Sequence, residues 1–349
     1  MDSIVSFEPG DDIKTLGLTR RAKWVHSSIR IRFPSRIHAT PIDCNRFTFG
    51  RPGGGGLGFA VTTSNILSAA RHSDLDIQSS NPVHLPLVTH YARVMQHVLG
   101  VQVRLAVTIQ MAKMTRQHFG LGSSVCLACA VVSAINTMCG KPLSVGEMRC
   151  LIAHNFVEEF RGRVTRGLET GVGTSVAFRG GISVVADALV EIFHRDFPAN
   201  LDIVLVDPKT TRPNSDQPES EEMLRRTFFL DNSYRFTKAY DLLMNIIPAL
   251  QDGDLRRFGE YMWDIQFSGT HLSMIQSYEN YGKRIYETLG CLRENGAVAC
   301  GLSSVGPAIY AIVERHDTAS LKRTITKRLK APYWQLGADN TGILVDHLD

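Results

Sequence analysis

The chain has 349 residues, of which 44% are hydrophobic and 21% are charged, a composition typical of globular proteins and long enough for two domains. The formal net charge is only +4, and no long basic run alternates with aromatic residues, so small anionic ligands fit this chain better than a nucleic acid. The N-terminus lacks the apolar region of a signal peptide, and no apolar run reaches membrane-spanning length, so we expect a cytoplasmic protein without membrane contact. The seven cysteines lack metal-ligand spacing and indicate buried, reduced thiols.

Strands and one helix are predicted in the first third of the chain. Residues 24–40 mix β-branched and basic residues with partial alternation, which predicts strands. The four consecutive glycines within 50–61 predict a tight turn or a backbone that closely approaches a ligand, and residues 62–78 continue as a further strand. The spacing predicts a helix over 86–100 and a strand over 101–110.

The middle of the chain is predicted to hold two helices and a loop. One helix begins near Ser123 and stops at Gly140. A second helix covers 144–156 and opens with a capping box. The Gly, Arg and Thr-rich residues 160–175 predict a functional loop, and a strand follows it.

The second half has a different pattern, with a buried-type strand at 201–207, a polar loop after it and several helices between 219 and 295. Paired strands at 296–304 and 307–314, a basic helix at 317–330 and a terminal strand complete the chain. We therefore place a domain boundary near residue 190, dividing the chain into 1–190 and 191–349.

The sequence HFGLGSS at 118–124 runs directly into the first predicted helix of the middle segment. The backbone N–H groups at a helix start have no intrahelical partner, and the helix dipole makes the potential there positive. Glycines let the backbone come close to a ligand, so this turn is a candidate phosphate site. The alternative is a helix that is capped by serine and holds no ligand.

Five stretches occur in order between about residues 30 and 315: SRIHATPID at 35–43, GRPGGGGLGFAV at 50–61, HFGLGSS, RGRVTRGLETGVGTSVAFRGG at 161–181 and GLSSVGPAIYAIV at 301–313. Together they resemble the GHMP superfamily of small-molecule kinases, and more closely its beta-ribofuranosylaminobenzene 5'-phosphate synthase branch, which is close to the synthases of C-nucleoside antibiotics such as formycin and pyrazofurin. The resemblance implies a two-domain α+β fold, with an N-terminal α/β domain, a ferredoxin-like C-terminal domain and a site between them.

The resemblance also implies a reaction. Ribose 5-phosphate from phosphoribosyl pyrophosphate would be joined to a ring carbon of an amino-aromatic or aminopyrazole carboxylate, releasing pyrophosphate and carbon dioxide. GHMP kinases carry an Asp that acts on the acceptor hydroxyl, and Gly173 stands at that position. Glycine cannot take a proton, so we expect no use of ATP. A kinase with another base, such as Asp43 or Glu169, and a non-catalytic phosphometabolite-binding protein are the alternatives.

Candidate phosphate-binding residues come from the matched loops. The backbone of Gly120, Gly122, Ser123 and Ser124 would bind phosphate, and Arg163 and Arg166 would clamp pyrophosphate or the 5-phosphate with bidentate hydrogen bonds. A Mg²⁺ ion would suit Ser124 and an acid such as Glu159.

Other candidates follow from the matched segments. We expect His38, Asp43 and Glu169 to be catalytic, with Arg36 beside His38 on one strand face, facing an anionic aromatic acid. Further substrate-binding residues are expected in the matched loops. They are His118 beside the glycines of the phosphate loop, Gly54, Gly55 and Gly56 of the early turn, and the hydroxyl residues Thr170, Ser303 and Ser304.

Two residues depart from the branch. The aminobenzoate enzymes typically have Gln and Trp around the late Ser-Ser, where this chain has Leu302 and Val305. A smaller heteroaromatic acceptor is therefore credible beside 4-aminobenzoate. The resemblance also suggests a homodimer.

Overall fold

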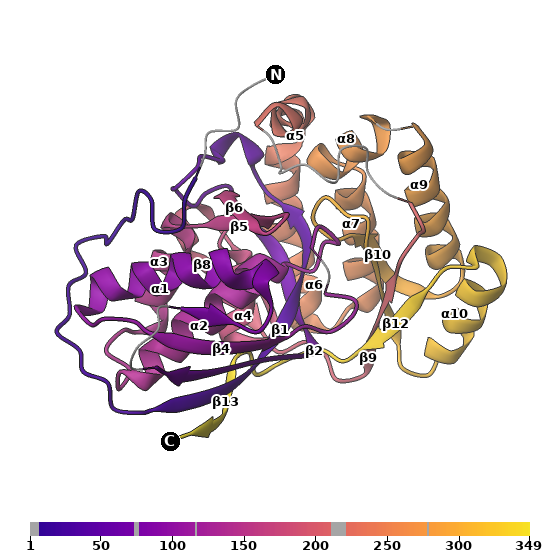
Figure 1. The fold of residues 1–349 in the computed structure, drawn as a ribbon. Helices are drawn as coiled ribbons and strands as arrows, with labels where there is room; N and C mark the ends of the chain where they lie inside the picture. The colour runs from indigo at the N-terminus through magenta and orange to yellow at the C-terminus, as the bar shows by residue number, and fades with distance from the viewer. Residues whose placement is uncertain (1–6, 73–76, 116, 211–220, 278) are drawn as a thin grey trace.

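Two β-sheets, one in each half of the molecule, form the framework of the protein, as the computed structural model shows (Figure 1). It describes residues 7–72, 77–115, 117–210, 221–277 and 279–349. The long strands β1 (Ser28–Pro41) and β2 (Gly56–Arg71) pair antiparallel along nearly their whole lengths and run toward the boundary between the two halves.

The N-terminal sheet has seven strands, in the order β13-β1-β2-β4-β3, with β7 beside β2 and β8 beside β7. The remaining strands are β3 (Gln78–Ser79), β4 (Leu105–Gln110), β7 (Ile182–Val185), β8 (Glu191–Arg195) and β13 (Leu344–Leu348).

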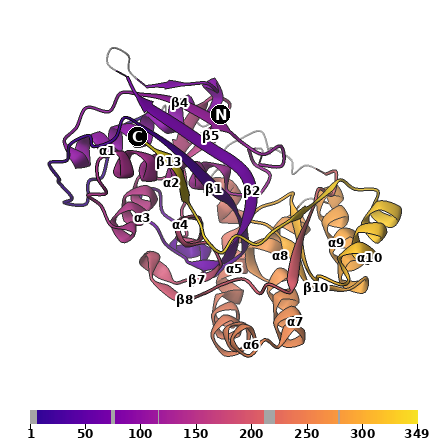
Figure 2. The same ribbon diagram turned by 90° about the horizontal axis from the view of Figure 1, so that it is seen from below.

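Helices cover one face of this sheet (Figure 2). They are α1 (Leu85–Leu99), α2 (Ser123–Met138), α3 (Val145–His154) and α4 (Val172–Arg179). Almost every residue of α2 is buried, because this helix packs between β1 and the other helices. The predicted capping box of α3 is present, with the Ser144 and Glu147 side chains each bonded to the other's backbone N–H. A hairpin of β5 (Val157–Phe160) and β6 (Arg163–Arg166) stands beside α1.

The second sheet has four antiparallel strands in the order β10-β11-β9-β12. They are β9 (Leu201–Val206), β10 (Ala297–Leu302), β11 (Ile309–Glu314) and β12 (Tyr333–Leu336). Helices separate β9 from β10 and β11 from β12, which gives the ferredoxin-like βαββαβ arrangement. The expected α+β architecture with a ferredoxin-like C-terminal domain is therefore confirmed.

The helices of the C-terminal half follow β9 and β11. They are α5 (Glu221–Asp241), the π-helical turn η4 (Leu242–Ile246), α6 (Ile247–Asp252), α7 (Leu255–Gln266), α8 (Gly269–Ser277), α9 (Glu279–Glu294), α10 (Thr318–Thr324) and the π-helical turn η5 (Ile325–Leu329). Within the described ranges, none of the helices is both long and apolar enough to cross a bilayer.

Several segments differ from their sequence-based prediction. The loop expected at 160–175 contains β6 and the start of α4. The glycine run turns at Gly54 and Gly55, both with positive φ, and Gly56 already belongs to β2, which continues unbroken to Arg71. Three short 3-10 turns were not predicted, η1 (Cys44–Arg46), η2 (Pro82–His84) and η3 (Asp187–Leu189).

The two halves are joined at more than one point of the chain. The expected boundary at residue 190 falls between β7 and β8, which pair in the same sheet. The chain also returns at its end, where β13 pairs with β1 (Figure 2). Both halves of the molecule therefore contain segments from beyond residue 190.

Candidate active site

A cavity lies where the two domains meet. One wall comes from β1, the phosphate loop and the first turn of α2, and another from β5 and the segment before α4. Helix α8 and the turn between β10 and β11 contribute residues from the C-terminal domain. The predicted site residues that line this cavity are Arg36, His38, His118, Gly120, Gly122, Ser123, Ser124, Glu159, Glu169, Thr170 and Ser304.

The phosphate loop has the backbone that its sequence predicts. Gly120 and Gly122 have φ of 102° and 63°, a left-handed conformation that glycine adopts without steric cost. Gly122 is the N-cap of α2, and no side chain caps this helix in the described structure. The N–H groups of the first turn therefore face the cavity without an internal partner, as a phosphate site requires.

The late Ser-Ser turn ties the C-terminal domain to this loop. The Ser303 hydroxyl donates to the carbonyl of Gly120 at 2.6 Å and accepts the N–H of His38 at 3.2 Å. The N–H of Ser304 donates to the carbonyl of His38 at 2.8 Å. Ser303 therefore connects β1 to the phosphate loop and does not line the cavity, whereas Ser304 lines it.

Arg36 lies along the phosphate loop. Its backbone N–H donates to the carbonyl of Leu121 at 3.0 Å, and a Cβ at Gly122 would come within 2.7 Å of the Arg36 Cγ. Its Nε and Nη1 atoms are buried and have no hydrogen-bond partner among the described residues. A buried guanidinium with unused donors beside a helix N-terminus is suited to binding a phosphate.

The Glu169 carboxylate lies at the start of helix α4, and this residue lines the cavity. Its Oε1 accepts the N–H of Gly171 at 2.8 Å, and the N–H groups of Gly173 and Thr174 also contact the carboxylate. Burial raises the pKa of this carboxyl, although the nearby Arg36 charge and these N–H groups act in the opposite direction.

Gly173, the position of the kinase aspartate, packs directly against α2. A Cβ there would lie 2.7 Å from Cγ1 of Val125, closer than side chains approach. An aspartate at this position would therefore have to displace the Val125 side chain.

Glu159 is the second buried carboxylate of the cavity. Its Oε1 contacts Nδ1 of His84 at 2.7 Å, while Oε2 is buried with no hydrogen-bond partner in the described parts of the chain. The Glu159 backbone N–H donates to the Ser124 hydroxyl at 3.3 Å, so the two residues are neighbours at the cavity. Two hard oxygen ligands of this kind fit Mg²⁺, which takes its remaining ligands from water and phosphates.

His38 is buried where β1 passes the cavity. Burial, together with the charges of Arg36 and Lys238 and the neighbouring His271, holds the pKa of His38 well below its ordinary value. The imidazole is therefore neutral at neutral pH. A Cβ at Gly56 would lie 2.6 Å from its Nε2, so this glycine leaves space for the ring rather than contacting a ligand.

Several predicted residues lie away from the cavity. Arg166 is half exposed, pairs with Asp12 at 3.0 Å and stacks on Phe7. Arg163 is exposed, because alternation along β6 turns the neighbouring Val164 into the core instead. The expected clamp role of these two arginines finds no support in this geometry.

Asp43 and the glycine turn also lie outside the cavity lining. The Asp43 carboxylate caps η1, with Oδ1 accepting the N–H of Asn45, and it faces Arg46 and Arg235. Gly54 donates its N–H to Asp187, and Gly55 packs on the backbone after β7. These residues therefore have structural partners here, and their expected direct contacts with substrate stay a prediction.

Sequence reasoning missed part of the lining. Cys44 and Phe47 from the η1 segment, Gln117 from the phosphate loop and Thr270 from α8 all line the cavity. Thr270 belongs to no motif, and the packing of both α8 and η1 on α5 brings it to the site.

The fold and the loop at the helix start define a class of protein. The models described as "GHMP kinases N terminal domain" and "GHMP kinases C terminal" match residues 86–168 and 246–330. The chain therefore has the N-terminal and the C-terminal domain of the GHMP kinases, as predicted.

Among curated proteins, the chain is similar to Beta-ribofuranosylphenol 5'-phosphate synthase of Archaeoglobus fulgidus, with 25% identity over 303 residues, 82% of this chain and 88% of that protein. The protein of the same name from Methanothermobacter thermautotrophicus is 25% identical over 313 residues, 81% of this chain and 88% of its own length. The predicted similarity to ribofuranosyl 5'-phosphate synthases is confirmed. The names of these relatives describe a phenol and not the aminobenzene compound of the expected branch, and closeness to the C-nucleoside synthases stays a prediction.

Solved structures share the fold. The L. major mevalonate kinase in complex with R-mevalonate has a TM-score of 0.65 and 14% identity, covering 90% of this chain and 98% of that one. Homoserine kinase from Cytophaga hutchinsonii has a TM-score of 0.63 and 15% identity, covering 93% and 98%. At such identities the likeness describes the fold alone.

Proposed function

We propose that this protein is a phosphoribosyl pyrophosphate-dependent C-ribosyltransferase. It joins ribose 5-phosphate to a ring carbon of an amino- or hydroxy-substituted aromatic carboxylate, or of an aminopyrazole carboxylate as in C-nucleoside formation, and releases pyrophosphate and carbon dioxide. The similarity to ribofuranosylphenol phosphate synthases supports the reaction class.

One observation carries the choice of a synthase over a kinase. Gly173 packs against Val125 at the place where a GHMP kinase needs its aspartate. The nearest cavity carboxylate in sequence, Glu169, is engaged with the N–H groups of α4. A cavity that binds phosphates but offers no free carboxylate at this position suits a reaction in which phosphate leaves without activation of a hydroxyl.

Binding of the donor falls to the phosphate loop and Arg36. Backbone N–H groups of the first turn of α2 and the unused Arg36 donors would take the negative charge that develops on pyrophosphate as it leaves. Ser124 and Glu159 would hold a Mg²⁺ ion, whose charge offsets that of the phosphates when it is bound.

The bonds balance without an external base. The anomeric C–O bond breaks and its electron pair leaves with pyrophosphate, while the ring carbon bearing the carboxylate attacks the sugar. The C–C bond to the carboxylate then breaks, and its electron pair restores the aromatic ring as carbon dioxide departs. Because no ring proton has to be removed, neutral His38 is suited to holding the substrate by a hydrogen bond.

We expect pyrophosphate release that requires phosphoribosyl pyrophosphate and an aromatic acid and does not require ATP. The test is incubation with Mg²⁺ and a panel of amino-, hydroxy- and aminopyrazole carboxylic acids, with mass spectrometry of the products and an assay for pyrophosphate. A joined product that is lighter by one carbon dioxide than the adduct of the two substrates without pyrophosphate identifies the decarboxylation. Phosphorylation of an acceptor by ATP, with no pyrophosphate from the ribosyl donor, would replace this function with the kinase alternative.

Gly122→Val is expected to weaken donor binding sharply while leaving the fold intact. A branched side chain at this left-handed position would strain the loop and displace Arg36, whose Cγ occupies the space. Calorimetric titration with phosphoribosyl pyrophosphate measures the effect. Gly253→Val is the matched control, because Gly253 has a similar φ of 73° but open space around it, far from the loop. Equal donor affinity in both variants would mean that the loop binds no phosphate.

A further inference from the structure

Helix α5 buries two charged side chains and exposes three aromatic ones. Asp231 and Lys238, two turns apart, have side chains that are 0% and 1% exposed. Phe229, Phe236 and Tyr240 on the same helix are 79%, 74% and 62% exposed. This reverses the ordinary pattern of a surface helix. Apolar residues of similar volume usually stabilise a core at least as well as a buried ion pair does, so this pair is a candidate for a functional role.

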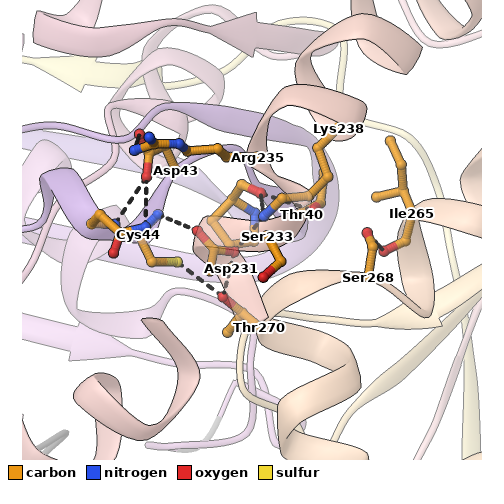
Figure 3. Close-up of polar contacts among 12 residues, drawn as sticks. Thr40, Asp43, Cys44, Asp231, Ser233, Arg235, Lys238, Ile265, Ser268 and Thr270 are labelled. Carbon is orange, nitrogen blue, oxygen red and sulfur yellow. Dashed lines mark hydrogen bonds and ion pairs between the residues drawn. The ribbon is translucent and has the colours of Figure 1, made fainter. Parts of the chain in front are cut away.

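The pair joins α5 of the C-terminal domain to Cys44 of the N-terminal domain, and Cys44 lines the cavity (Figure 3). The Lys238 ammonium donates to the Asp231 carboxylate and, at 2.9 Å, to the carbonyl of Pro41 at the end of β1. Asp231 Oδ2 accepts the N–H of Cys44 at 2.6 Å. Gly269 at the start of α8 lets the pair fit, because a Cβ there would lie 2.5 Å from Asp231 Oδ1.

Thr270 connects this pair to the cavity. Its hydroxyl donates to Asp231 Oδ1 at 3.1 Å, and its oxygen lies 2.9 Å from the Sγ of Cys44. Asp231, paired with an ammonium, is an acceptor only, so the proton of the Thr270 hydroxyl is committed to it. The thiol of Cys44 has both the Thr270 oxygen and the Asp231 carboxylate as acceptors, and burial raises the pKa of this thiol, which keeps its proton in place.

The direction of these bonds fixes what Thr270 can offer a ligand. A hydroxyl has one donor and two acceptor sites. Asp231 takes the proton of the Thr270 hydroxyl, and the Cys44 thiol can fill one of its two acceptor sites. At least one acceptor site is then not filled by any described residue. Thr270 and Cys44 both line the cavity, beside Pro41 and Phe47, whose apolar surfaces suit an aromatic ring.

We propose that Thr270, oriented by the buried Asp231–Lys238 pair, accepts a hydrogen bond from an amine or hydroxyl substituent on the aromatic acceptor and so determines which ring the enzyme uses. This proposal rests on the proposed function and deepens it. Asp231 and Lys238 are positioning residues, since they act through Thr270 and do not line the cavity. An acceptor whose substituent cannot donate would leave the remaining acceptor site of Thr270 unfilled, which weakens the binding of that acceptor.

The test compares three acids of similar size, 4-aminobenzoate, 4-hydroxybenzoate and 4-fluorobenzoate, of which only the last has no donor. Binding is measured by calorimetry for the parent, Thr270→Val and Thr270→Ser, with a thermal melt for each. The parent and Thr270→Ser are expected to prefer the amino or hydroxy acid over the fluoro acid by roughly tenfold, and Thr270→Val to lose that preference with fluoro-acid binding unchanged.

Two failures can be told apart. If no acid gives pyrophosphate with phosphoribosyl pyrophosphate, the proposed function fails, whereas the binding preference still tests Thr270. If a folded Thr270→Val keeps the parent's preference, or if the parent binds the three acids equally or binds none, the assignment of Thr270 is overturned. If Thr270→Val does not fold, Thr270→Cys is the second variant. Because a thiol is a weak hydrogen-bond acceptor, this variant should also lose most of the preference for the amino and hydroxy acids. A Thr270→Cys protein that keeps the full preference would overturn the proposal.

Discussion

Replacing Arg36 by alanine is expected to lower kcat/KM for phosphoribosyl pyrophosphate by about two to three powers of ten, the loss typical when a donor to developing negative charge is deleted. The Arg36 side chain lies against Gly122 and keeps buried, unused donors beside the first turn of α2. Arg36→Lys keeps the charge but loses the planar set of donors, so its kcat/KM should lie between those of the parent and Arg36→Ala. Steady-state kinetics with the donor varied, and pyrophosphate measured, give the result.

The control is Arg166→Ala. Because Arg166 is half exposed and paired with Asp12 on the surface, this variant should behave like the parent. The opposite result would be a large loss of kcat/KM in Arg166→Ala while Arg36→Ala behaves like the parent. It would assign the phosphate clamp to Arg166 and would mean that the hairpin of β5 and β6 moves during the reaction. A loss confined to the KM of the aromatic acid would instead assign Arg36 to the acceptor carboxylate.

Asp231→Ala is expected to destabilise the protein by about 3–5 kcal/mol, because it leaves the Lys238 ammonium buried without its counter-ion. It also removes the partner of the Cys44 N–H and of the Thr270 hydroxyl, both at the domain boundary. Thermal unfolding followed by circular dichroism should show a midpoint lowered by more than about 5 °C.

Two further variants separate charge from packing. Asp231→Leu combined with Lys238→Met replaces both charges by apolar groups and should lose much less stability than Asp231→Ala alone. Glu260→Ala breaks the exposed Arg256–Glu260 pair and should change stability by less than about 1 kcal/mol. Equal destabilisation by Asp231→Ala and Glu260→Ala would show that the buried pair contributes no more than a surface ion pair.

The elements that rest on local interactions were predicted from the sequence. The capping box of Ser144 and Glu147 and the glycine termination of α1 at Gly100 depend on hydrogen bonds between residues a few positions apart. The phosphate loop belongs here too, since Gly120 and Gly122 need only their own freedom to adopt positive φ. For the same reason the sequence indicated the family, because its matched segments are local loops with fixed glycines.

The occupants of the cavity were decided by tertiary structure. Arg36 and Arg166 both stand in matched segments, yet only Arg36 reaches the loop, because β1 passes beside α2 while β6 turns its arginines to solvent. Ser303 bonds with His38 across 265 positions of the chain. No local pattern predicts such a contact, since it depends on how the two sheets are placed against each other.

Helix α5 shows the same division between local pattern and tertiary structure. The sequence alone was sufficient to predict a helical segment there, because helix formation depends on near neighbours. Its charged residues would by themselves be assigned to solvent, since burial of an unpaired charge is unfavourable. Only the folded chain brings the Pro41 carbonyl, the Cys44 N–H and the Thr270 hydroxyl together around Asp231 and Lys238, and these partners are what allow the two charges to lie inside the protein.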